Sequence, residues 1–140
     1  MVMKKVLALI AISTLINCTA FRSGNQELGL LTGTVGLLEG DCMPSPNSPP
    51  CEPRPISTWV YATLPSEGFA PEKVVDSVRS IGNGQFSMNL SPGKYSLFAK
   101  YAGEVACTQF NCNPDCFCQP VDIAADSTST VTLVVNKATW

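Results

Sequence analysis

Hydrophobic and polar residues alternate along most of the chain after residue 29, in short runs separated by Gly, Pro and Asn. In the run 85–90, Phe86, Met88 and Leu90 share one side and polar residues share the other. Alternation with a period of two is typical of strands that bury one face. The pattern predicts seven strands, at 30–38, 56–64, 73–81, 85–90, 95–101, 120–123 and 128–135.

The same part of the chain contains no convincing amphipathic helix, so the expected fold class is all-β. Seven short strands in a chain of this length favour an antiparallel β-sandwich. The run 56–64 leaves its orientation open, because either Val60 with Ala62 or Trp59 with Tyr61 could face the core.

Two turns are predicted from their residue types. Asn83-Gly84 predicts a hairpin between the runs 73–81 and 85–90, because both residue types tolerate a positive φ. Ser91-Pro92-Gly93-Lys94 predicts a turn before the run 95–101, with Pro presetting φ and Gly supplying a positive φ.

The N-terminal segment has a different pattern. Lys4 and Lys5 precede a continuous apolar run at 6–16, the layout of a secretory signal peptide. As a helix this run would span about 17 Å, well short of the roughly 30 Å hydrocarbon core of a bilayer. A cleaved signal peptide helix is therefore favoured over a transmembrane anchor.

The segment Leu15-Ile16-Asn17-Cys18 resembles the lipobox of bacterial lipoproteins, with Asn17 where Gly, Ala or Ser is usual. The resemblance implies a signal peptide at 1–17, a diacylglycerol on the Cys18 thiol, a lipidated tether at 18–28 and a folded domain at 29–140. It also implies a membrane partner, reached through the lipid, and the cell envelope as the location. Thr19 is not the Asp that marks retention at the inner membrane, which favours the outer membrane. The alternative is an ordinary signal peptide cleaved after Ala20, which would discard Cys18.

Cysteine content gives an independent argument about the same residue. The chain has seven cysteines, at 18, 42, 51, 107, 112, 116 and 118. An odd number in an exported protein needs an account of the spare thiol. Lipidation of Cys18 leaves six cysteines, which could form three disulfides in an oxidising compartment.

Spacing restricts how these six cysteines pair. Cys42 and Cys51 flank a loop rich in Pro, Ser and Asn, and we expect them to form a local disulfide. In the late group, Cys116 and Cys118 are too close in sequence to pair comfortably. We therefore expect the other two, Cys107 and Cys112, each to pair with one of them, with the order left open. The alternative is a zinc site made by the four thiolates of the late group.

Three short motifs carry a second resemblance. Gly33-Thr34-Val35, Gly84-Gln85-Phe86-Ser87 and the segment from Leu90 to Tyr95 are similar to the G-x-V, G-x-F and L-x-P-G-x-Y motifs of transthyretin-like domains. That group includes the regulatory domain of carboxypeptidases. The resemblance implies a transthyretin-like β-sandwich but says little about activity, because these motifs are turn and core positions.

Charge and residue content narrow the function. The chain has no histidine, which removes the usual general base near neutral pH, and its carboxylates form no recognisable catalytic pair. We expect no enzyme activity, no catalytic residue, no resident metal and no cofactor. After removal of residues 1–17, seven basic residues face eleven acidic ones, a formal charge of −4 that makes nucleic acid a poor partner.

The expected function is a membrane-anchored module that binds a protein or an envelope polymer of unknown identity. The alternatives are a purely structural envelope lipoprotein and a metal-handling protein that uses the late cysteine group. Aromatic residues could provide a binding face, with packing in the core as the other interpretation. The candidates are Trp59, Tyr61, Phe98, Phe110 and Phe117.

Overall fold

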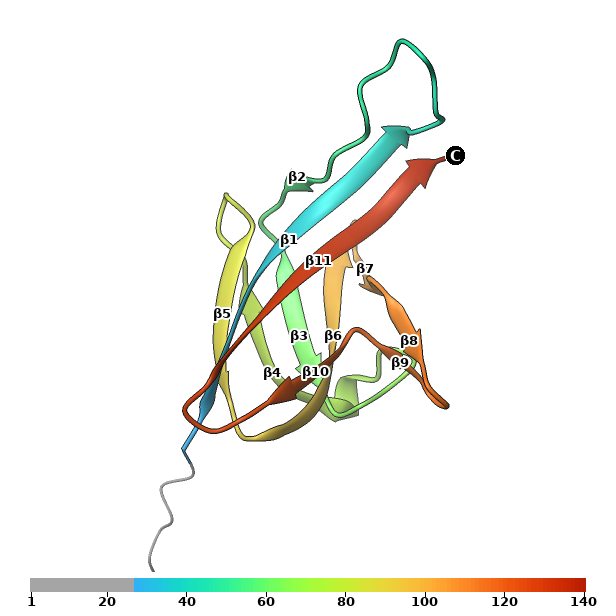
Figure 1. Ribbon diagram of the computed structural model, residues 1–140. Helices are drawn as coiled ribbons and strands as arrows, with labels where there is room; N and C mark the ends of the chain where they lie inside the picture. The colour runs from blue at the N-terminus through green and yellow to red at the C-terminus, as the bar shows by residue number, and fades with distance from the viewer. Residues whose placement is uncertain (1–26) are drawn as a thin grey trace, which may run out of the picture.

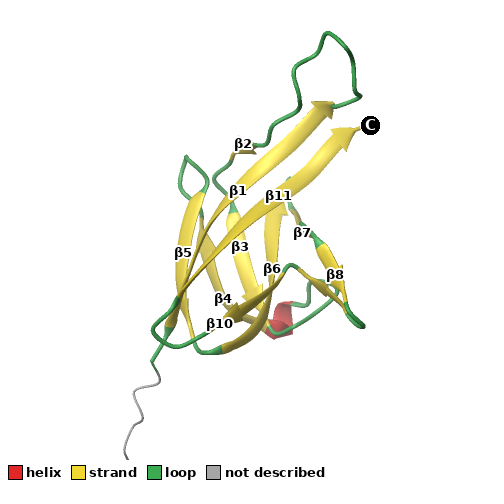
Figure 2. Ribbon diagram, viewed as in Figure 1, coloured by secondary structure: helices red, strands yellow, loops and turns green. Residues whose placement is uncertain are grey.

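The computed structural model describes residues 27–140. The predicted signal peptide at 1–17, the predicted lipidation site Cys18 and all but the end of the predicted tether at 18–28 lie outside the described residues. From residue 27 onward no helix is long and apolar enough to cross a membrane. The described chain folds into two β-sheets and a small separate hairpin (Figure 1, Figure 2).

Sheet A is built around β1 (Gly29–Asp41). One edge of β1 pairs with β11 (Thr128–Thr139), and the other pairs first with β5 (Gln85–Leu90) and then with the short β2 (Arg54–Pro55). The β1–β11 ladder is parallel and runs from the pair of Leu30 with Thr128 to the pair of Asp41 with Thr139. The expectation of a purely antiparallel sandwich is wrong at this ladder. The chain crosses from sheet B to sheet A just before β11, so β11 starts at the same end as β1 (Figure 1).

Sheet B has β6 (Gly93–Tyr101) and β3 (Trp59–Thr63) at its centre. β3 pairs with β6 on one side and with β4 (Val74–Arg79) on the other. The far edge of β6 pairs with β10 (Pro120–Ile123) and with β7 (Glu104–Cys107). A 3₁₀ turn, η1 (Pro71–Lys73), precedes β4. The separate hairpin consists of β8 (Phe110–Cys112) and β9 (Cys116–Cys118).

All seven predicted strands are present, at β1, β3, β4, β5, β6, β10 and β11. The count of seven is nevertheless too low, since the described residues hold eleven strands. The four that the pattern did not predict, β2, β7, β8 and β9, have between two and four residues each. Runs this short contain too few alternations to be recognised from sequence.

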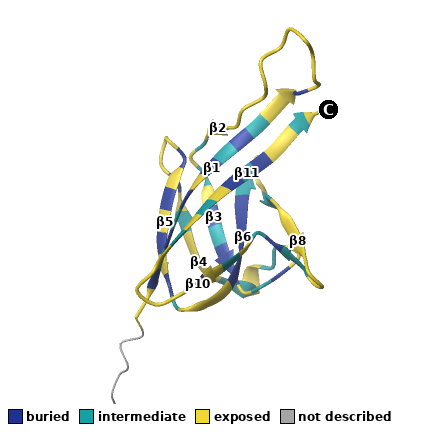
Figure 3. Cartoon of the chain, in the orientation of Figure 1, coloured by how far each residue is buried: buried dark blue, intermediate teal, exposed yellow. Residues whose placement is uncertain are grey.

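The core lies between the two sheets and follows the predicted alternation (Figure 3). Phe86, Met88 and Leu90 of β5 are buried, as the pattern predicted. The structure also settles the orientation of the run 56–64, because Val60 and Ala62 are fully buried in the core. The remaining members of the core cluster are Leu31, Val35, Leu37, Tyr95, Leu97, Ala99, Ile123, Leu133 and Val135.

The Asn83-Gly84 turn differs from its prediction. Gly84 has a positive φ of 78°, whereas Asn83 does not, and the N–H of Gly84 donates to the Ile81 carbonyl at 2.8 Å. The turn is present, but the strands on either side, β4 and β5, belong to different sheets. The prediction of a paired hairpin is therefore wrong, and the turn instead carries the chain from sheet B to sheet A.

The residues of the L-x-P-G-x-Y motif form a tight corner at the start of β6. The Tyr95 hydroxyl donates to the Ser91 carbonyl at 2.5 Å, while the ring is buried in the core. Gly93 in the turn has a φ of 154°. The chain bends at Pro92, but Gly93 and Lys94 already belong to β6, so the predicted turn is shorter than expected. The bond from Tyr95 closes this corner at the start of the strand.

Candidate functional site

The outer face of sheet B carries a row of three large side chains near the start of β3. Trp59 lies directly opposite Arg79 in the β3–β4 register. On the other side Val60 pairs with Ala99 of β6, which places Lys100 beside Trp59. Residues opposite one another point to the same face, with Cβ atoms about 5 Å apart. An indole therefore stands between two cationic residues, in what we call the Arg79–Trp59–Lys100 row.

This row lines an open groove of about 610 Å³ at one end of the sandwich. The other walls are β2 with the loop 56–58 that follows it, Gly82 and the turn formed by Ala102 and Gly103. Trp59 is the first residue of β3 and Tyr101 is the last of β6, so the groove lies where β3 begins and β6 ends. The start of β1 lies at the opposite end of the sandwich (Figure 1). The groove thus lies at the end of sheet B that is away from the start of β1.

The turn beside Lys100 is a two-residue hairpin loop. Ala102 and Gly103 both have positive φ, 50° and 80°, and connect the pair of Tyr101 with Glu104. Positive φ at both central residues is the geometry of a type I′ turn, which matches the twist of the flanking strands. The loop fixes the end of β6, and Lys100 with it.

Buried Ser80 holds the opposite wall of the groove. Its hydroxyl accepts from the Thr58 N–H at 2.8 Å and donates to the Ile56 carbonyl at 2.8 Å. The Ser80 N–H donates to the Thr58 carbonyl at 2.8 Å, and the Ser57 hydroxyl donates to the Ser80 carbonyl at 2.7 Å. These bonds tie the loop to the residue that follows β4 without the help of a ligand, and such preorganisation lowers the entropy cost of binding.

Replacing this hydroxyl should loosen the loop. We expect Ser80→Ala to lower the free energy of unfolding by about 1–2 kcal/mol, because the Thr58 N–H loses its acceptor in a site with little access to water. Chemical denaturation of the variant measures the change. Ser77→Ala is the control, since Ser77 is exposed on β4, three residues before Ser80. Equal stability of the two variants would contradict the role given to Ser80.

Glu39, Arg54 and Tyr101 form a hydrogen-bonded group beside the groove. Arg54 donates to Glu39 Oε1 at 2.6 Å, and the Tyr101 hydroxyl donates to Glu39 Oε2 at 3.1 Å. Both bonds lower the pKa of Glu39, and the bond from Arg54 has the larger effect. The bond between Arg54 and Glu39 also raises the pKa of Arg54. The bond to Glu39 raises the pKa of Tyr101. The charge of Arg54 is therefore balanced locally.

Arg79 and Lys100 differ from Arg54 in this respect. Neither has a carboxylate oxygen within 4.0 Å in the described part of the chain, whose ion pairs involve other basic residues. The Arg79 Nε–H donates only to the Ser57 hydroxyl, at 3.3 Å, which orients the guanidinium and leaves its terminal N–H groups available. The groove therefore presents two unneutralised cations and an indole.

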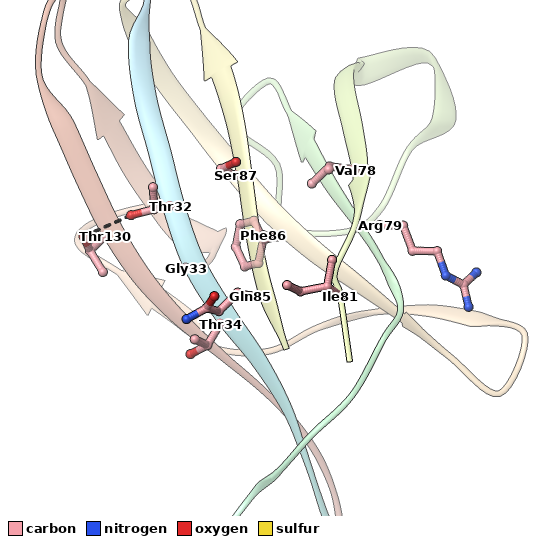
Figure 4. A pocket seen from close by; sticks show the side chains of 10 residues that line it. All are labelled: Thr32, Gly33, Thr34, Val78, Arg79, Ile81, Gln85, Phe86, Ser87 and Thr130. Carbon is pink, nitrogen blue, oxygen red and sulfur yellow. Dashed lines mark hydrogen bonds between the residues drawn. The ribbon is translucent and has the colours of Figure 1, made fainter. Parts of the chain in front are cut away.

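A second hollow, of about 620 Å³, opens at the seam where β4 and β5 separate (Figure 4). Val78, Ile81 and Phe86 form its apolar side, and the polar side comes from hydroxyl and amide groups of sheet A. Thr32 and Thr130 are hydrogen-bonded to one another there, at 3.3 Å. Arg79 is the one charged residue that lines it, so it offers fewer recognition groups than the groove.

All six cysteines of the domain form disulfides. Cys42 pairs with Cys51, as predicted, with Cα atoms 5.6 Å apart. In the late group Cys107 pairs with Cys118 and Cys112 with Cys116, which confirms the predicted pattern and gives its order. The zinc-site alternative is contradicted, because the late group has no thiolate left to bind a metal. Within residues 27–140 no three His, Cys, Asp or Glu side chains gather as possible metal ligands.

The five candidate aromatic residues do not form one surface. Trp59, Tyr61 and Phe98 share the outer face of sheet B by register, but Phe98 is covered by Phe69, with ring centroids 5.6 Å apart. Phe110 and Phe117 lie on the β8–β9 hairpin. Trp59 is the member of the set that combines exposure, at 39%, with a place in the groove.

Compared with known proteins, the chain matches no family model and no curated protein. The role of the groove therefore has to be argued from its own chemistry. Two basic residues of that groove, Arg79 and Lys100, were not singled out from sequence. A charged residue at a strand end has no distinguishing signal until the register shows its neighbours.

Proposed function

We propose that this protein is a lipid-anchored, non-catalytic module of the cell envelope that binds a protein or polymer ligand at the Arg79–Trp59–Lys100 row. The observation that carries the proposal is the row itself: two cations with no carboxylate partner among residues 27–140 flank an exposed indole on an open face. Aromatic and Arg side chains are the residues most enriched where binding energy concentrates.

The anchor part of the proposal is supported by the cysteines. The three disulfides use all six cysteines of the domain, so none of these six is left to pair with Cys18, the seventh cysteine of the chain. It is also the residue that the lipobox resemblance assigns to lipidation. A lipid on Cys18 would hold the start of β1 toward the membrane, with the groove at the other end of the sandwich (Figure 1).

We also infer that the domain is a variant of the transthyretin-like sandwich. The three motifs that carry the resemblance have defined structural roles. Gly33 leaves space for the Phe86 ring, and Tyr95 closes the corner before β6. The loop stapled by Cys42–Cys51 and the hairpin stapled by Cys112–Cys116 would be additions to that plan.

Two measurements test the proposal. For the anchor, we expect radiolabelled palmitate to be incorporated into the wild type and not into Cys18→Ser. Equal labelling of the two would contradict the proposed lipidation of Cys18. For the binding, we expect the mature protein carrying Cys18→Ser, which has no lipid of its own to bring it to membranes, to co-sediment with isolated envelope material. Addition of the triple variant Arg79→Gln, Trp59→Ala, Lys100→Gln to this protein should remove most of the co-sedimentation. A matched triple variant in the same protein, Lys94→Gln, Phe110→Ala, Lys137→Gln, should sediment like Cys18→Ser alone. If both triple variants sediment equally, the row is not the binding site.

A further inference from the structure

The groups free to contact a ligand in the groove are few and distinct. The nearby hydroxyls are already engaged: Ser57 donates to the Ser80 carbonyl, Thr58 to the Lys100 carbonyl and Tyr101 to Glu39. What remains available is the indole face of Trp59 and the two cations beside it. This set suits a ligand that combines an anionic group with a flat or weakly polar ring.

The backbone around the groove argues against an extended peptide. β3 is hydrogen-bonded on both sides, to β4 and β6, and β6 is bonded to β3 and to β7 or β10. A peptide that adds as a strand needs a free edge with unpaired N–H and C=O groups. The central strands β3 and β6 have none. β4 has a free edge on the side away from β3, so a peptide added there would lie beyond Arg79 and outside the row. A ligand that spans the row itself must therefore be held by side chains.

A pyranose ring is a suitable partner for the exposed indole face of Trp59. Its faces present C–H groups, which carry partial positive charge and little hydration, to the negative face of an aromatic ring. A carboxylate on the sugar can then pair with Arg79 or Lys100. Arg in particular holds carboxylates with two parallel N–H donors, and such charge-assisted bonds are about twice as strong as neutral ones.

Charge complementarity gives the site its selectivity. The chain after residue 17 has a formal charge of −4, so most of its surface repels a polyanion. The described residues hold three ion pairs, which neutralise Arg54, Lys94 and Lys137. Arg79 and Lys100 lie on the same row with no such partner. Lys73, at the end of η1, also has no ion pair among these residues, but it stands outside the row. An acidic polymer would therefore be attracted most strongly to the row, where two such cations lie together.

From these observations we propose that the groove binds a carboxylate-bearing glycan, a polymer of uronic acid residues. One sugar ring stacks on Trp59, and carboxylates of the polymer pair with Arg79 and Lys100. This inference rests on the proposed function and names the class of its ligand. The Ser80 bonds hold the wall in place, so little reorganisation is needed on binding.

The test measures dissociation constants for the full mature lipoprotein in detergent micelles. The acidic glycan probes are polygalacturonate, alginate and hyaluronan. Two comparison probes separate ring from charge: methyl-esterified polygalacturonate keeps the rings and removes the charge, and polyglutamate keeps the carboxylates and removes the rings. We expect at least one acidic glycan to bind at low salt, with affinity falling as salt is raised, and both comparison probes to bind at least tenfold more weakly.

Variants assign that binding to the row. We expect Arg79→Gln, Lys100→Gln and Trp59→Ala each to weaken binding about tenfold or more, equivalent to ~1.4 kcal/mol. Trp59→Phe, which keeps an aromatic face, should retain most of the affinity. Lys94→Gln and Phe110→Ala are the controls, because they remove an exposed cation and an exposed aromatic outside the groove.

Three outcomes would overturn the inference. If methyl-esterified polygalacturonate binds as well as the acid, charge has no part in recognition. If polyglutamate binds as well and Trp59→Ala has no effect, the ligand is an acidic peptide. If no acidic glycan binds, the ligand class is wrong. In each case the proposed function would still hold if envelope co-sedimentation depends on the row. If co-sedimentation does not depend on the row, both the proposed function and this inference are wrong.

Discussion

Gly33→Ala is expected to lower the free energy of unfolding by roughly 3 kcal/mol, near the upper end for overpacking in a core. Gly33 lies in β1 between Phe86 of β5 and Val131 of β11. A Cβ there would be 2.4 Å from the Val131 carbonyl oxygen and 2.7 Å from Cζ of Phe86. The oxygen belongs to the backbone of the parallel ladder, so it cannot move without disturbing that ladder.

Chemical denaturation of the full mature protein measures this loss. Gly68→Ala is the control, because a Cβ at Gly68 would meet no atom within 4 Å. The double variant Gly33→Ala, Phe86→Leu should recover only part of the stability, since the smaller side chain relieves the contact with the ring but not that with the carbonyl. A Gly33→Ala protein as stable as Gly68→Ala would show that the sheet tolerates a side chain at this position.

Removal of the Cys107–Cys118 disulfide should have an effect of similar or greater size. This bond joins the end of β7 to β9 over a sequence separation of 11, and Cys118 is fully buried. We expect the double variant Cys107→Ala, Cys118→Ala to lose about 3–5 kcal/mol of unfolding free energy. About 3 kcal/mol comes from loop closure in the chain-entropy model, and the rest comes from the cavity left by a buried sulfur.

The control is the double variant Cys112→Ala, Cys116→Ala, whose bond spans a sequence separation of 4 in an exposed hairpin. The shorter loop alone makes the expected loss about 1 kcal/mol smaller, and there is no buried cavity to add. Thermal and chemical denaturation of both variants give the comparison. An equal loss in the two would mean that burial of Cys118 adds nothing to the effect of the cross-link.

The sequence located the long strands well because their alternation extends over many residues. β5 and β10 coincide with the predicted runs 85–90 and 120–123, and the alternation along β1 and β11 places their apolar residues inward. Its errors concern long-range pairing, which alternation does not encode. Nothing in the pattern distinguishes a parallel partner for β1 from an antiparallel one, since both bury the same residues.

The sequence predicted the positions of hairpin turns only in part, because strand pairing can override the local preference of the turn residues. Asn83-Gly84 has the stronger hairpin sequence, yet the type I′ turn occurs at Ala102-Gly103, where an alanine adopts a positive φ. Local preference for this conformation is worth about 1–2 kcal/mol against alanine. The β6–β7 ladder imposes the conformation on Ala102, whereas the sheet crossing after β4 draws the chain away from a hairpin at Asn83.

The residues of the candidate site also could not be brought together from the sequence, because they become neighbours only through long-range strand pairing. Trp59 was among the aromatic candidates, but Arg79 and Lys100 are 20 and 41 positions away in sequence. They become neighbours of Trp59 only through the pairing of β3 with β4 and β6. Cysteine pairing was more accessible, because close spacing alone excluded a bond between Cys116 and Cys118.

The parallel ladder between β1 and β11 has a consequence for how the chain acquires its fold. Its paired residues are separated by 98 positions, as in the bond between Thr32 and Thr130, so sheet A cannot close until nearly the whole chain is available. Pairing over such distances folds slowly. A chain that crosses a membrane with its N-terminus first, as the proposed lipoprotein would, delivers β11 last. The order of strands would then keep the domain unfolded during transport and delay completion of the sandwich until the chain reaches the side where its disulfides can form.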